Sequence, residues 1–277
     1  MPIVTLSTDF KENDFVAGAM KGQLLSLNKE LIITDISHEL SSGNYAHTSY
    51  VCRNAFKYYP ENTIHIVLID LFKNNTPHLL LTEYKQQYII APDNGILTMI
   101  FNQSIENIVK VNLNAQERTT IAITSTAASI ANELSKGKYI RQIGKPVEEI
   151  EEIYPMRPAI GPNWIEGQII FIDKYGNAVV NITRKEFEEY GKGRRFQILF
   201  SRNDIVKKIS PNYADVQTGS ALAWFNSAGN LELAISNGQI AHLFGLRDIS
   251  VAQARHNKLY ETVRIFFEEE PVETPPL

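Results

Sequence analysis

The first 154 residues alternate short runs of β-branched and aliphatic residues with segments whose apolar residues recur at helical spacing. Residues 3–7 are typical of a buried strand, and residues 15–27 carry an apolar helical stripe behind a polar connection. The rhythm continues with strands expected at 31–36, 63–69, 79–82, 87–90 and 108–113, and helices expected at 45–58 and 126–136. Such alternation predicts an α/β domain with a mainly parallel sheet.

A proline- and glycine-rich stretch then interrupts this pattern. Pro155, Pro158, Gly161 and Pro162 favour neither helix nor strand, so residues 155–163 are expected to link two domains. A length of 277 residues, about twice that of a typical domain, agrees with this division.

Beyond the linker the apolar runs become short and turn residues separate them. Strands are expected at 165–172, 178–182, 195–200, 221–225 and 231–235, with one helix at 183–190. Residues 164–267 therefore predict a smaller, β-rich, barrel-like domain. The Glu- and Pro-rich residues 268–277 predict a solvated tail.

The composition excludes several classes of protein. Lys plus Arg number 27 against 31 Asp plus Glu, a net charge of −4, so no broad positive field favours nucleic acid. The single cysteine, Cys52, cannot form an internal disulfide, and no long apolar run suggests a membrane span. We therefore expect a cytoplasmic protein that engages neither nucleic acid nor membrane.

Common catalytic motifs are missing from the sequence. It contains no Gly-x-Gly-x-x-Gly fingerprint, no Gly-Lys-Ser/Thr phosphate loop and no Gly-x-Ser-x-Gly elbow, which removes the main support for dehydrogenase, kinase and serine hydrolase chemistry. His38-Glu39 lacks the second histidine of a zinc helix, so we expect no metal site.

Acidic residues follow two of the expected strands. Asp9 comes after the first strand and Asp70 after the strand at 63–69, while Asp14 opens the first helix. The carboxyl ends of strands form the ligand crevice of α/β sheets, and a carboxylate there suits a vicinal diol or a cation. Asp14 has a purely structural alternative as a helix N-cap, and either strand-end acid alone could be a turn former.

The second half has one stretch dense in polar and turn residues. Asp173 and Asn177 flank Lys-Tyr-Gly between two expected strands, and residues 226–230 form a similar stretch. Both are typical of hairpin turns. Periodicity does not separate such turns from a binding edge.

As a set, six segments resemble the S-adenosylmethionine hydroxide adenosyltransferase family, which also includes fluorinating and chlorinating enzymes. They are Thr8-Asp9-Phe10 with Asp14, GAMKG at 18–22, DISHE at 35–39, APDNGILT at 91–98, IDKYGN at 172–177 with Asn181-Ile182, and NSAG at 226–229. They occur in the family's order over roughly residues 3 to 250. The resemblance implies a homotrimer that binds S-adenosylmethionine between the N-terminal domain of one chain and the C-terminal domain of its neighbour.

The resemblance also implies roles for individual residues. Asp9 would accept the ribose diol, and Asp14 and Asp173 would hold the methionine ammonium. Adenine would meet the Asn177 amide and the Tyr213 ring, and the methionine carboxylate would meet the Ser227 hydroxyl.

The implied reaction is attack of water or hydroxide on ribose C5′, which yields adenosine and methionine. The sulfonium is already a good leaving group, so no metal or other cofactor is required. In the family's hydrolytic members, an Asp, an Arg and a His hold this water. By the resemblance, Asp70 matches the Asp. Residues 71–78 contain no Arg, and Ala122 occupies the position of the His.

This departure leaves several functions open. If Lys73 or His78 replaces the missing cation, Asp70 can still position a water for hydrolysis. Otherwise the protein binds S-adenosylmethionine or adenosine without turnover. A halide-dependent reaction is a further alternative, with Thr124 and Ser125 near the replaced segment, and a purely structural scaffold is another.

Overall fold

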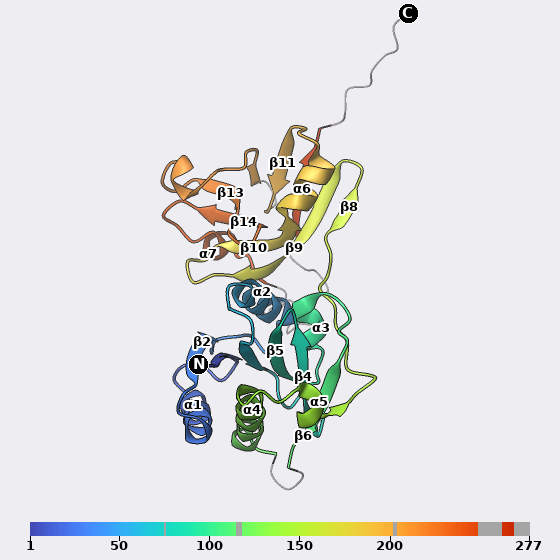
Figure 1. The fold of residues 1–277 in the computed structure, drawn as a ribbon. Coiled ribbons are helices and arrows are strands. Elements are labelled where there is room, and N and C mark those ends of the chain that lie inside the picture. The colour runs from blue at the N-terminus through green and yellow to red at the C-terminus, as the bar shows by residue number, and fades with distance from the viewer. Residues whose placement is uncertain (75, 115–117, 202–203, 249–261, 269–277) are drawn as a thin grey trace, which may run out of the picture. The chain divides into compact units, whose positions relative to one another are not determined.

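The computed structural model describes residues 1–74, 76–114, 118–201, 204–248 and 262–268. The chain forms two compact units, Met1–Pro155 and Met156–Leu277, coloured blue to green and yellow to red in Figure 1. The change of unit falls at the start of the proline-rich stretch. From residue 269 onward, the tail expected at 268–277 lies outside the described residues.

The N-terminal unit is built on a seven-stranded sheet within its described residues, in the order β2-β1-β3-β5-β4-β6-β7. The strands are β1 (Ile3–Thr8), β2 (Ile32–Ser37), β3 (Ile64–Leu68), β4 (His78–Tyr84), β5 (Gln87–Pro92), β6 (Ile108–Asn112) and β7 (Lys145–Pro146). Strands β2, β1, β3 and β5 pair in parallel, and the β4–β5 hairpin turns the remaining edge antiparallel. The expected α/β architecture is confirmed.

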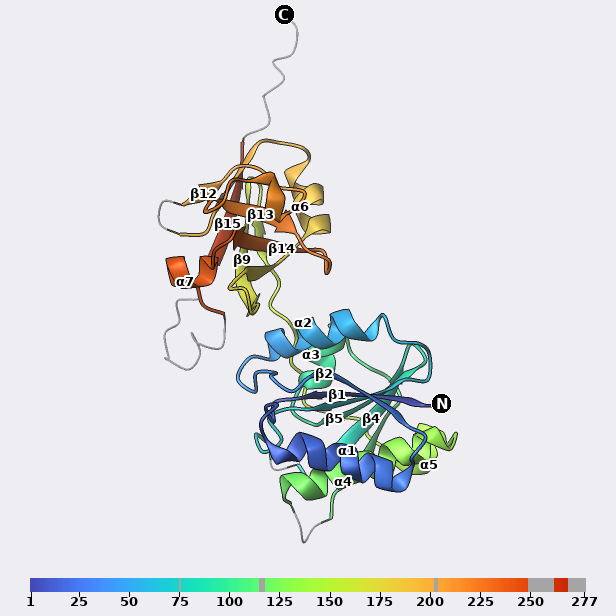
Figure 2. The ribbon, with the colours of Figure 1, turned by 90° about the vertical axis from the view of Figure 1, so that its left-hand side faces the viewer.

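Helices cover both faces of this sheet. They are α1 (Phe15–Leu27), α2 (Tyr45–Phe56), α3 (Ile96–Phe101), α4 (Thr120–Ser135) and α5 (Ile140–Ile143). Figure 2 shows α1, α4 and α5 on one face and α2 with α3 on the other. Each face buries its own apolar cluster, with Met20 and Leu24 of α1 in one and Cys52 and Phe56 of α2 in the other. This packing fixes the carboxyl ends of β1 and β3 side by side.

Two helices differ from the sequence expectation. Helix α4 begins at Thr120 rather than 126 because the Thr119 hydroxyl accepts from Ala122 N–H and so caps an earlier first turn. Helix α3 was not expected, and it starts after Gly95, whose φ of +92° suits glycine. A β-carbon at Gly95 would lie 2.5 Å from Ile153 Cγ1, so glycine is required there.

The C-terminal unit is a curved antiparallel sheet. Its order is β12-β11-β15-β9-β10-β14-β13, with β8 beside β9. The strands are β8 (Ala159–Gly161), β9 (Trp164–Ile172), β10 (Ala178–Thr183), β11 (Phe196–Leu199), β12 (Ile205–Val206), β13 (Ala221–Phe225), β14 (Asn230–Ile235) and β15 (Thr262–Phe267). One end of β9 pairs with β15 and the other with β10, which bends the sheet around a shared apolar core. The expected β-rich, barrel-like fold is confirmed.

Short helices flank this second sheet. They are α6 (Arg184–Gly191), the 3₁₀ turn η1 (Tyr213–Asp215) and α7 (Ile240–Phe244). Helix α6 was expected at 183–190, and Thr183 with Glu186 forms the capping box that sets its start. Across the described part of the chain, no helix combines the length and apolar character needed to span a membrane.

Candidate functional site

Asp9 and Asp70 lie together at the carboxyl edge of the N-terminal sheet. Strands β1 and β3 are adjacent and parallel, with Thr8 opposite Leu68, so the residues that follow them leave the sheet at the same place. The Asp70 backbone N–H donates to Asp9 Oδ2 at 2.8 Å. The structure thus joins two acids that are 61 residues apart in sequence.

The environment of Asp9 favours its neutral form more than water does. Burial, together with the nearby Asp70 charge, raises the pKa of Asp9 from its ordinary value of 3.8, while backbone N–H groups of Asp70 and Asp9 itself oppose the shift. A cationic ligand or the hydroxyls of a diol would favour the charged form. The site is therefore suited to a positively charged, hydroxyl-bearing ligand.

Asp70 is held in an uncommon backbone conformation. Its φ is +48°, the left-handed region, which costs a non-glycine residue about 1–2 kcal/mol. The Asn94 side chain stabilises this bend by donating to the carbonyl of Ile69 at 3.0 Å and to that of Asp70 at 3.4 Å. Strain retained by such side-chain support is typical of functional sites.

The two expected substitutes for the missing cation lie in different surroundings. The Tyr45 hydroxyl donates to Asp70 Oδ2 at 2.9 Å, and Lys73 Nζ lies 4.6 Å from the centroid of the Tyr45 ring. His78 Nε2 instead lies 3.1 Å from Asp93 Oδ2, and both side chains are largely buried. Lys73 is therefore associated with Asp70 through Tyr45, whereas His78 is bonded to Asp93.

Asp14 serves as the N-cap of α1. Its Oδ1 accepts from Val16 N–H at 3.2 Å, as the structural alternative in the sequence predicted. Asp14 is also exposed, so its second oxygen is accessible to a ligand. The structural role and a ligand role are compatible at this residue.

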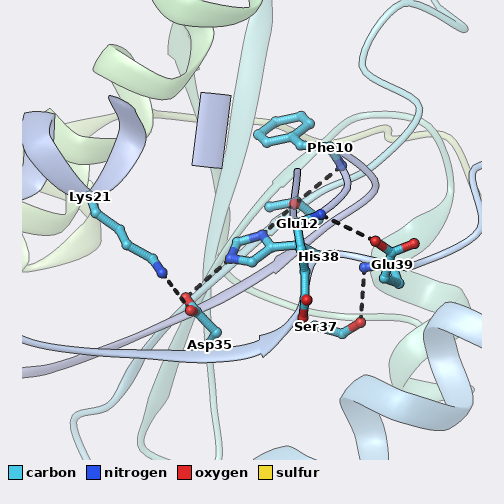
Figure 3. Close-up of polar contacts among 8 residues, drawn as sticks. Phe10, Glu12, Lys21, Asp35, Ser37, His38 and Glu39 are labelled. Carbon is cyan, nitrogen blue, oxygen red and sulfur yellow. Dashed lines mark hydrogen bonds and ion pairs between the residues drawn. The ribbon is translucent and has the colours of Figure 1, made fainter. Parts of the chain in front are cut away.

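A polar network holds the loop between β1 and α1, which carries Asp9 and Asp14. Thr8 Oγ1 lies 2.7 Å from His38 Nδ1, and His38 Nε2 lies 3.1 Å from Asp35 Oδ1. Figure 3 shows the His38 ring and Lys21 both directed at Asp35. Lys11 N–H donates to the carbonyl of His38 at 2.8 Å. Although burial opposes it, hydrogen bonds from Lys21 and His38 keep the pKa of Asp35 below its ordinary value. The network ties the acidic loop to the end of β2.

Residues 122–125, which the resemblance places at the position of the family histidine, are helical. Ala122, Thr124 and Ser125 lie in the first turns of α4, and Thr124 is buried with its hydroxyl donating to the Ile121 carbonyl at 3.0 Å. Thr124 is thus engaged by its own helix. Of residues 71–78, which carry Lys73 and His78, residue 75 lies outside the described residues.

In the C-terminal unit Asp173 organises the turn between β9 and β10. Its Oδ1 accepts from the backbone N–H groups of Tyr175 at 2.9 Å and Asn177 at 2.8 Å. Its Oδ2 accepts from the Asn177 side-chain amide at 3.0 Å. The interpretation as a hairpin turn is confirmed, because Ile172 and Ala178 pair across antiparallel strands.

The same amide extends toward a second cluster. Asn177 Nδ2 lies 3.4 Å from the Tyr213 hydroxyl, which donates in turn to Glu232 Oε1. Glu232 is only 5 % exposed and also accepts from Trp224 Nε1 at 3.0 Å. The rings of Tyr213 and Trp224 lie 4.6 Å apart between centroids, so an aromatic pair is fixed beside the Asn177 amide.

Ser227 lies in the turn that joins β13 to β14 and is exposed. The preceding residue, Asn226, shapes this turn by accepting from Ala228 N–H at 3.0 Å and also donates to Glu232 Oε2 at 2.9 Å. The structure therefore connects the Ser227 turn with Asp173, Asn177 and Tyr213 through one chain of hydrogen bonds.

Sequence reasoning missed three residues that organise these clusters. Tyr45 lies in the helix expected at 45–58 and Asn94 in the APDNGILT segment, and in neither case does the sequence indicate the distant partner. Glu232 lies within a strand, where its charge gave no sign that it is buried. A charged residue in an otherwise apolar strand was the one available signal for Glu232.

In the described ranges, no group of three or more His, Cys, Asp and Glu residues is arranged to hold a metal ion.

Family models match both units of the chain. The model described as the SAM hydroxide adenosyltransferase N-terminal domain matches residues 4–144, and that described as the C-terminal domain of the same proteins matches residues 167–251. Together the two matches cover well over half of the chain.

Named relatives agree with these matches, and a solved structure has the same fold. The chain is 30 % identical over 192 residues to the (R)-S-adenosyl-L-methionine hydrolase of Methanocaldococcus jannaschii, covering 67 % of this chain and 69 % of that protein. It is 24 % identical to the (R)-S-adenosyl-L-methionine hydrolase of Thermus thermophilus, covering 89 % and 96 %, and 22 % identical to the fluorinase of Nocardia brasiliensis, covering 89 % and 94 %. A crystal structure of an uncharacterized conserved protein from Thermotoga maritima superposes with a TM-score of 0.80 at 21 % identity, covering 96 % of this chain and all of that one.

Proposed function

The chain belongs to the SAM hydroxide adenosyltransferase family, and on that premise we propose that it hydrolyses S-adenosylmethionine to adenosine and methionine. The observation that carries this proposal is the Asp9–Asp70 pair at the carboxyl ends of β1 and β3. Two adjacent carboxylates suit a ligand that carries both a ribose diol and a positive sulfonium.

We assign the ligand contacts as follows. Asp9 accepts the ribose hydroxyls, while the exposed oxygen of Asp14 and the Asp173 turn receive the ammonium of the methionine moiety. In the C-terminal unit, the Asn177 amide and the Tyr213 ring receive adenine. The exposed Ser227 hydroxyl meets the methionine carboxylate. Support comes from the hydrogen-bonded cluster that already orders Asp173, Asn177 and Tyr213.

The reaction needs one activated water. Its oxygen forms the new bond to C5′ as the C5′–S bond breaks and that electron pair returns to sulfur, leaving a neutral thioether. The water proton passes to the Asp70 carboxylate and then to solvent, so Asp70 acts as general base. Because a sulfonium leaves without further activation, the proposal requires no metal or cofactor.

The assembly and location are part of the same proposal. The proposal includes a homotrimer in which the N-terminal domain of one chain and the C-terminal domain of its neighbour bind one ligand, as the family resemblance implies. The molar mass from light scattering tests this arrangement. We also propose a cytoplasmic location, which cell fractionation tests.

The direct test is incubation of purified protein with S-adenosylmethionine and quantification of adenosine and methionine by chromatography. We expect equimolar products well above the spontaneous rate and independent of added halide. Asp70→Asn supplies the matched inactive variant. Saturable binding without product would instead indicate that the protein binds S-adenosylmethionine without turnover. Formation of a 5′-halogenated nucleoside would indicate halide-dependent chemistry. Absence of binding would reject both forms of the proposal.

A further inference from the structure

Tyr45 connects the candidate base Asp70 to a positive charge. Its hydroxyl donates to Asp70 Oδ2 at 2.9 Å from the first residue of α2, and Lys73 Nζ lies 4.6 Å from the centre of its ring. Tyr45 lies in α2, whereas Asp70 and Lys73 lie in the loop after β3. Together they form a Lys73–Tyr45–Asp70 cluster at the carboxyl edge of the N-terminal sheet, where Asp9 also lies.

We propose that Tyr45, with Lys73 on its ring, is a positioning residue that holds the Asp70 carboxylate in the orientation needed to accept a proton from water. The assignment rests on the proposed hydrolysis. A phenol O–H fixes one carboxylate oxygen and leaves the other for the attacking water. The ammonium over the ring face makes that phenol a stronger donor through its cation–π interaction.

The surroundings of Tyr45 support its role as a hydrogen-bond donor. Burial first, and then the Asp70 carboxylate, raise the pKa of Tyr45 above its ordinary value of 10.0, so the phenol keeps its proton. The charged groups that act on it are the carboxylates of Asp70, Asp9 and Glu151 and the ammonium of Lys73. Tyr45 therefore donates to Asp70 as a neutral phenol with one ammonium group over its ring.

The other candidate cation is in a different arrangement. His78 Nε2 lies 3.1 Å from Asp93 Oδ2, and Asp93 Oδ1 also accepts from Glu151 N–H at 2.8 Å. His78 is thereby part of the contacts that hold the β4 start and residue 151. The geometry thus favours the Tyr45–Lys73 pair over His78.

The test compares Tyr45→Phe and Lys73→Met with wild-type protein in steady-state hydrolysis across pH. We expect kcat to fall about tenfold or more in Tyr45→Phe, because a hydrogen bond to a charged group is lost, while KM stays within about twofold. The acidic limb of the kcat profile moves to higher pH, since a carboxylate without its donor protonates more readily. Lys73→Met gives a smaller change of the same kind, and Lys73→Arg restores activity.

A matched lysine–tyrosine pair serves as control. Lys85 Nζ lies 5.4 Å from the ring centre of Tyr84 in the β4–β5 turn, at the opposite end of the strands, so Lys85→Met leaves both kcat and the pH profile unchanged. If Tyr45→Phe and Lys73→Met show the same kcat and pH profile as wild-type protein, the positioning role of Tyr45 and Lys73 is wrong, while the proposed hydrolysis still stands. A wild-type protein that releases no adenosine overturns the hydrolysis and the assignment together.

Discussion

Asp70 and Glu232 are both carboxylates that accept a hydrogen bond from a tyrosine, yet their surroundings differ. Glu232 is buried and also accepts from Trp224 and Asn226, so its oxygens are largely occupied by the protein itself. Among the described residues, Tyr45 is the side-chain donor to the partly exposed Asp70. A carboxylate has about four acceptor positions, so Asp70 retains capacity for a water that Glu232 lacks.

The difference suggests that the Glu232 cluster has a structural role, whereas Asp70 is left accessible to a water. Glu232 fixes Tyr213, Trp224 and Asn226 by hydrogen bonds, and under the proposed function this order would lower the entropic cost of binding. The N-terminal edge keeps Asp70 in a strained backbone conformation and partly open. We therefore expect substitutions in the two clusters to affect turnover and structure differently.

The largest expected effect is on turnover. Asp70→Asn removes the proton acceptor and is expected to lower kcat about a hundredfold or more, while the dissociation constant for S-adenosylmethionine changes by less than about threefold. Product chromatography and calorimetry measure the two quantities on the same sample. Parallel loss of binding and turnover would show that Asp70 holds the ligand rather than the water.

The second effect is on stability. Glu232→Ala leaves the buried donors of Tyr213, Trp224 and Asn226 without their acceptor, so we expect the free energy of unfolding of the C-terminal unit to fall by about 2–3 kcal/mol. Urea titration followed by tryptophan fluorescence measures the loss, with Asp70→Asn as the comparison variant. A change below about 0.5 kcal/mol would contradict a structural role for the buried carboxylate.

The third effect is a pH dependence of binding. Burial raises the pKa of Asp9 above 3.8, so on acidification Asp9 protonates at a higher pH than an exposed aspartate does. A protonated carboxyl no longer accepts from both ribose hydroxyls, so affinity falls as the pH is lowered through this raised pKa. Asp9→Asn is expected to bind about tenfold more weakly, without this acidic decline. Calorimetry across pH checks this, and a decline that persists in Asp9→Asn would assign it to another group.

Elements whose apolar residues recur at a regular spacing were predictable from the sequence. Helix α1 occupies the expected residues 15–27, because its apolar stripe and the Asp14 cap both mark its limits. Helix α3 was missed because five of its six residues are buried, so no polar face revealed a helical period. Strand β15 (Thr262–Phe267) was missed too, although its buried and exposed residues alternate as in a strand with one face on the core.

The site was predictable in part, for a similar reason. Asp9 and Asp70 follow parallel strands, and that topology alone places them at one edge. The contact of Tyr45 with Asp70 depends on how α2 packs over the sheet, which residue spacing does not encode. The same holds for Glu232, whose partners Tyr213 and Trp224 lie on different segments.

Isotope labelling tests the central claim most directly. Wild-type protein is incubated with S-adenosylmethionine in ¹⁸O-labelled water, and the products are analysed by mass spectrometry. We predict that the 5′-hydroxyl of adenosine carries ¹⁸O, that methionine does not, and that Asp70→Asn forms labelled adenosine about a hundredfold or more slowly. Unlabelled adenosine, or no adenosine from wild-type protein, would contradict hydrolysis at C5′ by a water held at Asp70.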